Sequence, residues 1–179
     1  LSYPMIIRKG DEDWQSHLSK LERHHTGAKE ADLSYRVVYR LLDAAEYGVS
    51  QHRHRVFIVG FRSDLQKEWS FPEPTHSLDR LLWDQWVSGE YWEEHRVPKS
   101  KLPTKHAKLA ARIRRLESDF SLFPPPGERC KTVRDALRGL PDPRNKSDTV
   151  PNHEFRDGAR PYHGHTGSSL DLPSKALKA

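Results

Sequence analysis

The stretch that decides the fold runs from Ala44 to Arg62 and reads Ala-Ala-Glu-Tyr-Gly-Val-Ser-Gln-His-Arg-His-Arg-Val-Phe-Ile-Val-Gly-Phe-Arg. Gly48 predicts a turn, because glycine adopts the backbone angles that tight turns require. A polar cluster follows the turn, and an apolar, β-branched run from Val56 to Val59 follows the cluster. Such a run, closed by Gly60, predicts a strand that is buried on both faces.

The polar cluster at the start of this strand contains Gln51, Arg53 and Arg55. Side chains two positions apart in an extended chain point to the same side, so the two arginines are predicted to face one ligand. Each guanidinium offers a planar set of donors that suits a phosphate or the edge of a base. The alternative interpretation is a solvated sheet edge, with Gln51 as a turn residue.

The segment before the turn predicts a second strand and a helix. Residues 35–42 alternate in the manner of a strand, and about a dozen residues separate them from the next strand. That connection is too short for a helical crossover, so antiparallel pairing is expected. The pattern from Asp11 to His24 predicts an amphipathic helix. The adjacent His24 and His25 cannot easily face one ion, so no metal site is assigned.

The central stretch resembles the Gln-Xaa-Arg-Xaa-Arg motif of the DNA cytosine-5 methyltransferases. The resemblance includes Asp43-Ala44 and the Tyr-Gly-Val turn before the motif, and the Val-Phe-Ile-Val-Gly strand after it. Ser50 departs from the family, which has proline there, and leaves a looser turn. The resemblance implies an α/β fold in which residues 1–68 end a Rossmann-like catalytic sheet. Residues 69–179 then form a proline-rich linker and an incomplete, small mixed α+β target recognition domain.

Two helices are predicted after the linker. Residues 78–95 contain aromatic side chains that favour a packing role over base stacking. Residues 103–118 place Leu109, Ile113 and Leu116 on one face. The opposite face is basic and is predicted to follow a phosphate backbone, although solvated faces of this kind are common. Its cations are Lys105, Lys108, Arg112, Arg114 and Arg115.

Residues 132–141 predict a short helix with Thr132 as its N-cap and Asp135 three residues later. This element resembles the Thr-Val-Xaa-Asp-Ala-Leu segment that leads into the family's target recognition region. Cys130 stands between Arg129 and Lys131, outside any Pro-Cys loop, and is therefore interpreted as structural.

The tail, residues 152–179, resembles the start of a recognition loop, with Ala176 in place of the family's threonine. Alternatively, it is a flexible Gly/Ser loop. The residues predicted to contact DNA are Lys108, Arg112, Arg115, Ser174, Lys175 and Lys178.

Composition narrows the classes of protein that fit. The chain has 179 residues, of which 35% are hydrophobic and 31% charged, so its apolar core is expected to be small or shared with a missing part. A net charge of +5 favours a polyanionic partner. The single cysteine excludes a disulfide framework, and no stretch is apolar enough to span a membrane. A cytoplasmic protein is expected.

The resemblance implies methyl transfer from S-adenosylmethionine to C5 of a cytosine flipped out of duplex DNA, in restriction-modification. It implies that Arg55 bonds the cytosine carbonyl, that Arg53 supports the nucleophile loop or a phosphate, and that Gln51 shapes the turn. The family's Phe-Xaa-Gly-Xaa-Gly cofactor loop, Pro-Cys-Gln nucleophile and Glu-Asn-Val segment are absent. The chain alone is therefore expected to be inactive, with the catalytic part upstream, on a second polypeptide or lost. A non-enzymatic DNA-binding module and a decayed remnant remain alternatives.

Overall fold

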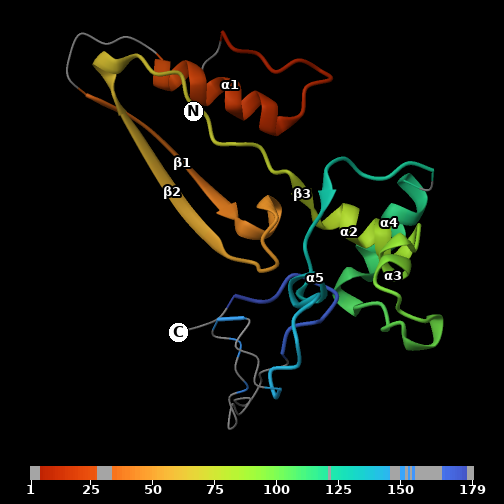
Figure 1. The fold of residues 1–179 in the computed structure, drawn as a ribbon. Coiled ribbons are helices and arrows are strands. Elements are labelled where there is room, and N and C mark those ends of the chain that lie inside the picture. The colour runs from red at the N-terminus through yellow and green to blue at the C-terminus, as the bar shows by residue number, and fades with distance from the viewer. Residues whose placement is uncertain are drawn as a thin grey trace. The chain divides into compact units, whose positions relative to one another are not determined.

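The computed structural model describes residues 5–27, 34–120, 122–145, 150–151, 153, 155 and 167–176. The chain divides into two compact units, of which the first contains residues 1–43 and 54–74 and the second contains residues 44–53 and 75–179 (Figure 1). The turn and the first part of the arginine motif therefore belong to the second unit, whereas Arg55 and its strand belong to the first. Each unit is described separately below.

The first unit consists of a helix and a two-stranded ribbon. Its elements are α1 (Trp14–Gly27), β1 (Tyr35–Asp43), β2 (His54–Arg62) and the 3-10 turn η2 (Ser63–Leu65). The strands are antiparallel, as predicted, and the register pairs Tyr35 with Arg62 and Asp43 with His54. The helix begins three residues later than predicted, because Asp13 Oδ1 accepts hydrogen bonds from the amides of Gln15 (2.8 Å) and Ser16 (3.1 Å).

One face of the ribbon packs in the interior of the first unit. Val38 on β1 is buried, with 2% of its surface exposed. Arg40 on the same face donates to Glu22 Oε2 of α1 at 2.8 Å, and Glu22 also accepts the amide of Phe71 at 3.1 Å. A guanidinium and a backbone amide thus satisfy a carboxylate that would otherwise be costly to bury.

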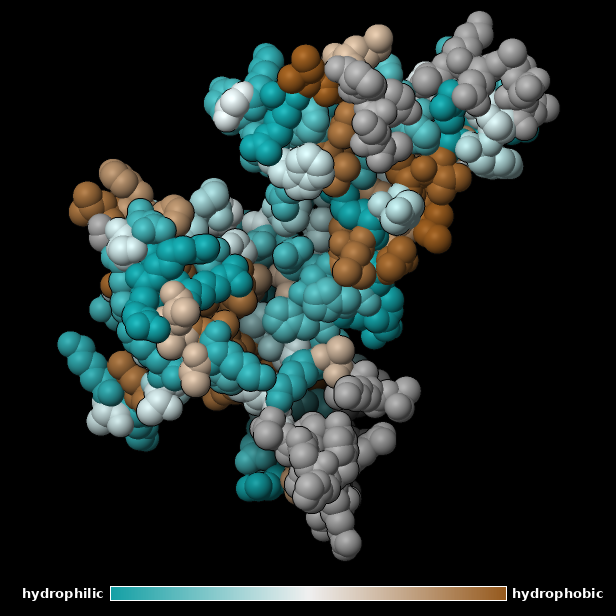
Figure 2. Space-filling model, turned by 180° about the vertical axis from the view of Figure 1, so that it is seen from behind, coloured by the Kyte–Doolittle hydropathy of each residue, from teal (hydrophilic) through white to brown (hydrophobic). Residues whose placement is uncertain are grey.

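The opposite face of the ribbon is apolar and exposed. Because directly opposed residues of an antiparallel pair share a face, the register groups Tyr39 with Ile58 and Leu41 with Val56. Exposed fractions reach 75% for Tyr39 and 72% for Ile58. Figure 2 shows the corresponding band of hydrophobic surface. The prediction that the run from Val56 to Val59 is buried on both faces is therefore wrong, since no described element of this unit covers this second face.

The second unit is mainly helical. Its elements are η1 (Ala44–Tyr47), β3 (His76–Ser77), α2 (Leu78–Trp86), α3 (Glu90–Glu94), η3 (Lys99–Lys101), η4 (Ala107–Leu109), α4 (Ala110–Asp119), β4 (Glu128–Arg129) and α5 (Val133–Leu137). Strands β3 and β4 form a short parallel pair. Ser77 caps α2 by accepting the amides of Asp79 and Arg80. Among the described residues, no helix is long and apolar enough to cross a membrane.

Two clusters of buried side chains hold the second unit together. Leu81, Tyr91, Trp92 and Cys130 form one cluster, and Leu82, Ile113 and Leu116 form the other. The predicted apolar face of residues 103–118 is thus confirmed, although the α-helix begins only at Ala110. Cys130 is 1% exposed, in agreement with a structural role.

Two helix predictions in the second unit need correction. The single aromatic helix predicted over residues 78–95 is divided into α2 and α3, because Gly89 adopts a left-handed backbone with φ of 83°. The capped helix after Thr132 forms, but α5 ends at Leu137 and not at Pro141. Leu137 and Leu140 are 50% and 38% exposed.

Candidate nucleic-acid interface

The arginine motif is preceded by a turn whose backbone favours glycine. Gly48 has φ of +85°, and a Cβ atom placed there would lie 2.9 Å from His76 Cε1. The turn leads into residues 50–52, which pair with the tail of the chain. Ser174 donates its amide to the Ser50 carbonyl at 2.8 Å, and His52 donates its amide to the Ser174 carbonyl at 2.9 Å. The motif and the predicted recognition loop are therefore hydrogen-bonded to each other.

The three predicted catalytic residues have different surroundings. Gln51 is half-buried, and its Nε2 donates to the Lys175 carbonyl at 3.4 Å. Arg53 is exposed, and its carbonyl accepts the amide of Ala44 at 3.2 Å. Arg55 is exposed on β2, and its Nη1 donates to the His54 carbonyl at 2.7 Å. Since β2 begins at His54, only Arg55 of the two arginines lies on the strand. That their side chains point to the same side stays a prediction.

Ion pairs within the second unit occupy part of the basic face of α4. Arg112 pairs with Asp79 of α2, and Arg115 Nη2 lies 3.4 Å from the same carboxylate. The hydrogen bond to Asp79 raises the pKa of Arg112 above its usual value. Lys105 pairs with Glu117 at 2.7 Å. These cations are partly neutralised inside the chain, so they offer less charge to an external phosphate than the sequence suggested.

Two other predicted DNA-binding residues line a common cavity. Lys108, which precedes α4, and Lys175 in the tail both line a cavity of about 450 Å³ in the second unit. His52 of the motif and His106 line it as well. Ser174 does not line the cavity itself; it lies between Pro173 and Lys175, which do, and it pairs with Gln51. Lys178, the last predicted contact, lies outside the described residues.

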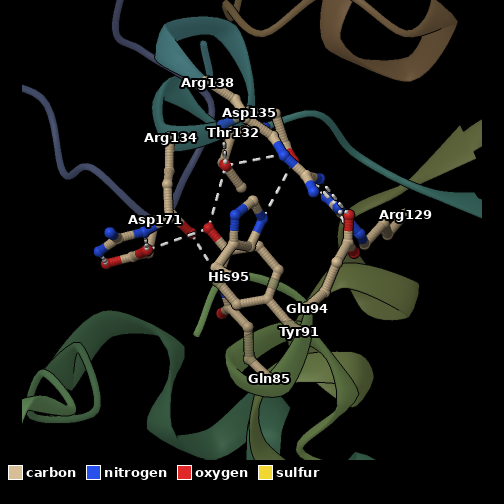
Figure 3. Close-up of polar contacts among 10 residues, drawn as sticks. All are labelled: Gln85, Tyr91, Glu94, His95, Arg129, Thr132, Arg134, Asp135, Arg138 and Asp171. Atoms are coloured by element: carbon tan, nitrogen blue, oxygen red, sulfur yellow. Dashed lines mark hydrogen bonds and ion pairs between the residues drawn. The ribbon is translucent and has the colours of Figure 1, made fainter. Parts of the chain in front are cut away.

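The second unit also contains a polar network that the sequence analysis did not predict (Figure 3). Arg134 binds Asp171 with two hydrogen bonds of 2.6 and 3.2 Å. The Tyr91 hydroxyl donates to Asp171 Oδ1 at 3.0 Å and lies 3.0 Å from Thr132 Oγ1. Burial raises the pKa of Tyr91 well above its usual value, so its hydroxyl stays protonated. This network joins α3, α5 and the tail.

Asp135 is the centre of the second half of the network. Its Oδ2 accepts the Thr132 amide and Arg129 Nη1, each at 2.7 Å, and Arg129 also binds Glu94 at 2.9 Å. Burial tends to raise the pKa of Asp135, but the hydrogen bonds from Arg129 and Thr132 outweigh it and hold the pKa well below its usual value. The Thr132–Asp135 capping box was visible in the sequence, whereas no local pattern indicates Asp171 as a partner.

The group of Glu94, His95 and Asp135 does not suit a metal, and the 450 Å³ cavity does not suit the expected cofactor. Ligand-type atoms of Glu94, His95 and Asp135 lie within 4.8 Å of one another, but Arg129 already binds both carboxylates. S-adenosylmethionine carries a sulfonium, an ammonium and a carboxylate group, so its net charge at neutral pH is positive. The described lining of the 450 Å³ cavity contains lysines and no carboxylate, so it does not suit a cationic cofactor.

Comparisons with known proteins identify type II methyltransferases as relatives of this chain. The chain is 54% identical over 43 residues to the type II methyltransferase M.MthTI of Methanothermobacter thermautotrophicus, which covers 24% of the chain and 13% of that protein. It is 45% identical over 64 residues to M.SacI of Streptomyces achromogenes, and this alignment covers 36% of the chain and 15% of that protein. It is 48% identical over 52 residues to M.BsuRI of Bacillus subtilis, and this alignment covers 29% of the chain and 12% of that protein. No solved structure matches the chain.

The family comparison covers far more of the chain than any of these three alignments. The model of the C-5 cytosine-specific DNA methylases matches residues 15–156, which include α1, the ribbon, the arginine motif and the helices of the second unit. The matched range includes both units, so the resemblance is not limited to the motif. The chain belongs to the family of C-5 cytosine-specific DNA methylases.

Proposed function

We propose that this chain is the part of a DNA cytosine-5 methyltransferase that presents the arginine motif and contacts the DNA target. The whole enzyme transfers a methyl group from S-adenosylmethionine to C5 of a flipped-out cytosine in a specific sequence, as part of restriction-modification. The observation that supports this most directly is the hydrogen-bonded pairing of residues 50–52 with Ser174. It joins the motif to the predicted recognition loop, so a nucleotide held by one lies near the other.

The proposed roles of the motif follow from the chemistry of its side chains. Arg55 would donate to the carbonyl of the flipped cytosine, and Arg53 would support the nucleophile loop or a nearby phosphate. Both are exposed and permanently charged, and a guanidinium can donate two parallel hydrogen bonds, which lysine cannot. Gln51 would hold the turn through its bond to the Lys175 carbonyl.

The exposed apolar face of the ribbon supports a catalytic part, outside this chain, as the partner. The exposed face of β1 and β2 presents six large apolar or aromatic side chains, namely Tyr35, Val37, Tyr39, Leu41, Val56 and Ile58. An apolar face of this kind is unfavourable in water and is typical of a surface that packs against another element. We infer that the missing part of the catalytic domain covers it. The chain alone, without a nucleophile or cofactor site, is then inactive.

The first test is to sequence the DNA on both sides of the encoding segment. An open reading frame that supplies the cofactor loop and a Pro-Cys-Gln nucleophile is expected. The enzyme translated from that frame should transfer tritiated methyl groups from S-adenosylmethionine to cytosine, and the chain alone should transfer none.

Variants of the full enzyme then test the role of Arg55. Arg55→Ala should lower the rate by about 100-fold or more, and Arg55→Lys should not restore it. Arg8→Ala, which removes an exposed arginine outside the motif and outside the basic face of residues 103–118, serves as the control and should retain activity. Methyl transfer by the purified chain, or full activity of Arg55→Ala, would contradict the proposal.

A further inference from the structure

The cavity between η4 and the tail combines cationic and apolar side chains. Its volume is about 450 Å³, and four separate segments of the second unit line it. Lys108 and Lys175 supply positive charge, and Leu109 and Leu172 supply apolar surface. Among its described lining residues there is no aspartate or glutamate. A site with this lining selects an anion attached to an apolar group.

Hydrogen bonds hold the residues of the cavity in place although they are far apart in sequence. The Lys175 amide donates to Ser168 Oγ at 3.1 Å, which closes the tail into a tight loop. The His52 amide donates to the Ser174 carbonyl at 2.9 Å, which places the arginine motif next to that loop. The backbone of Lys175 is therefore held beside the cavity before a ligand binds, and this lowers the entropic cost of binding.

Lys108 differs from the other cations near α4. Arg112 and Arg115 pair with Asp79, and Lys105 pairs with Glu117. In the described part of the chain, no carboxylate lies within ion-pair distance of Lys108. Its charge is therefore available to a ligand, whereas the charges of its neighbours are partly neutralised.

A hydrogen bond from the Lys108 amide orients the His106 imidazole and favours its neutral tautomer with the proton on Nε2. The Lys108 amide donates to His106 Nδ1 at 3.3 Å. In a neutral imidazole, one nitrogen accepts and the other carries the proton, so the proton lies on Nε2. Together with the ammonium groups, this N–H gives the cavity a set of donors that suits the oxygens of a phosphate.

We propose that this cavity binds one phosphodiester of the DNA backbone. Lys108 and Lys175 neutralise the phosphate, His106 donates to one of its oxygens, and Leu109 and Leu172 contact the adjoining deoxyribose. The inference rests on the proposed function, because it takes DNA as the ligand. It adds a positioning contact that sets the backbone beside the arginine motif and that does not depend on base sequence.

The test measures binding of a fluorescein-labelled duplex to the full chain by fluorescence anisotropy at several salt concentrations. The double variant Lys108→Gln/Lys175→Gln should bind about 10-fold more weakly at low salt. The slope of log K against log salt should fall by about 1, as expected for the loss of one phosphate contact. Lys108→Arg/Lys175→Arg should restore most of the binding.

A matched control separates the cavity from net charge. Lys99→Gln/Lys101→Gln removes the same two charges from η3, outside the cavity, and should bind nearly as well as the unchanged chain. Thermal melting checks that every variant is folded. Equal binding by the cavity variant and the control variant would overturn this inference and leave the proposed function standing. Weakened binding by the cavity variant, together with a full enzyme that does not methylate cytosine, would support the phosphate site and overturn the proposed function.

Discussion

At the scale of single residues, Asp135 is the carboxylate on which the polar network of the second unit depends. Its side chain is 13% exposed, as is that of Arg129, its main partner. Replacing Asp135 with asparagine would leave the Arg129 guanidinium partly unpaired and would put an amide N–H against either the Thr132 amide or the Arg129 guanidinium. Urea denaturation of Asp135→Asn should show a loss of about 2–4 kcal/mol in the free energy of unfolding.

The control for this substitution is an ion pair on the surface. Lys105 and Glu117 are 43% and 39% exposed, so Glu117→Gln should change the free energy of unfolding by less than about 0.5 kcal/mol. Equal losses in the two variants would show that burial does not strengthen the Arg129–Asp135 pair.

The same residue predicts how stability depends on pH. The pKa of Asp135 in the folded chain lies below its usual value of 3.8, so the folded state binds this proton more weakly than the unfolded state. Its contribution to stability is therefore fully present well above 3.8, begins to be lost as the pH falls below that value, and is lost completely only below the pKa of the folded state. Between about pH 5 and pH 3, the urea midpoint should fall more steeply for the unchanged chain than for Asp135→Asn. If the urea midpoints of the two proteins changed with pH in parallel, Asp135 would not be the group that titrates.

At the scale of elements, the two faces of the ribbon should respond in opposite ways to the same substitution. Tyr39 is 75% exposed and its neighbour Val38 only 2%. Tyr39→Lys should change stability by less than about 0.5 kcal/mol and should reduce binding of an apolar dye to the chain. Val38→Lys should unfold the first unit, because it buries an unpaired charge. If both variants unfold, the exposed face is covered in solution.

At the scale of the whole molecule, each unit has its own buried side chains and is expected to respond to mutations of its own core. Val38→Ala in the first unit and Leu116→Ala in the second each remove a buried side chain, at a cost of about 2 kcal/mol or more. Hydrogen exchange measured by mass spectrometry should show faster exchange of β1 in the first variant and of α4 in the second. Faster exchange of both elements in both variants would indicate one cooperative unit.

The sequence by itself determined the features that depend on neighbouring residues. The alternation of residues 35–42 and the short connection to the next strand predicted the antiparallel pair, and the pattern from Thr132 to Asp135 predicted a capped helix. The Gln51 to Arg55 motif indicated the family that the comparison then confirmed. These features follow from backbone geometry and side-chain spacing over a few residues, which a sequence displays directly.

Only the tertiary structure decided which surfaces are covered and which distant groups meet. The run from Val56 to Val59 has the composition of a buried strand, but burial depends on elements packed against it, and one face has none in the described first unit. The meeting of Asp171 with Tyr91, and of Ser174 with His52, joins segments that are far apart in the sequence. Such contacts arise from the packing of whole elements, and no local periodicity encodes them.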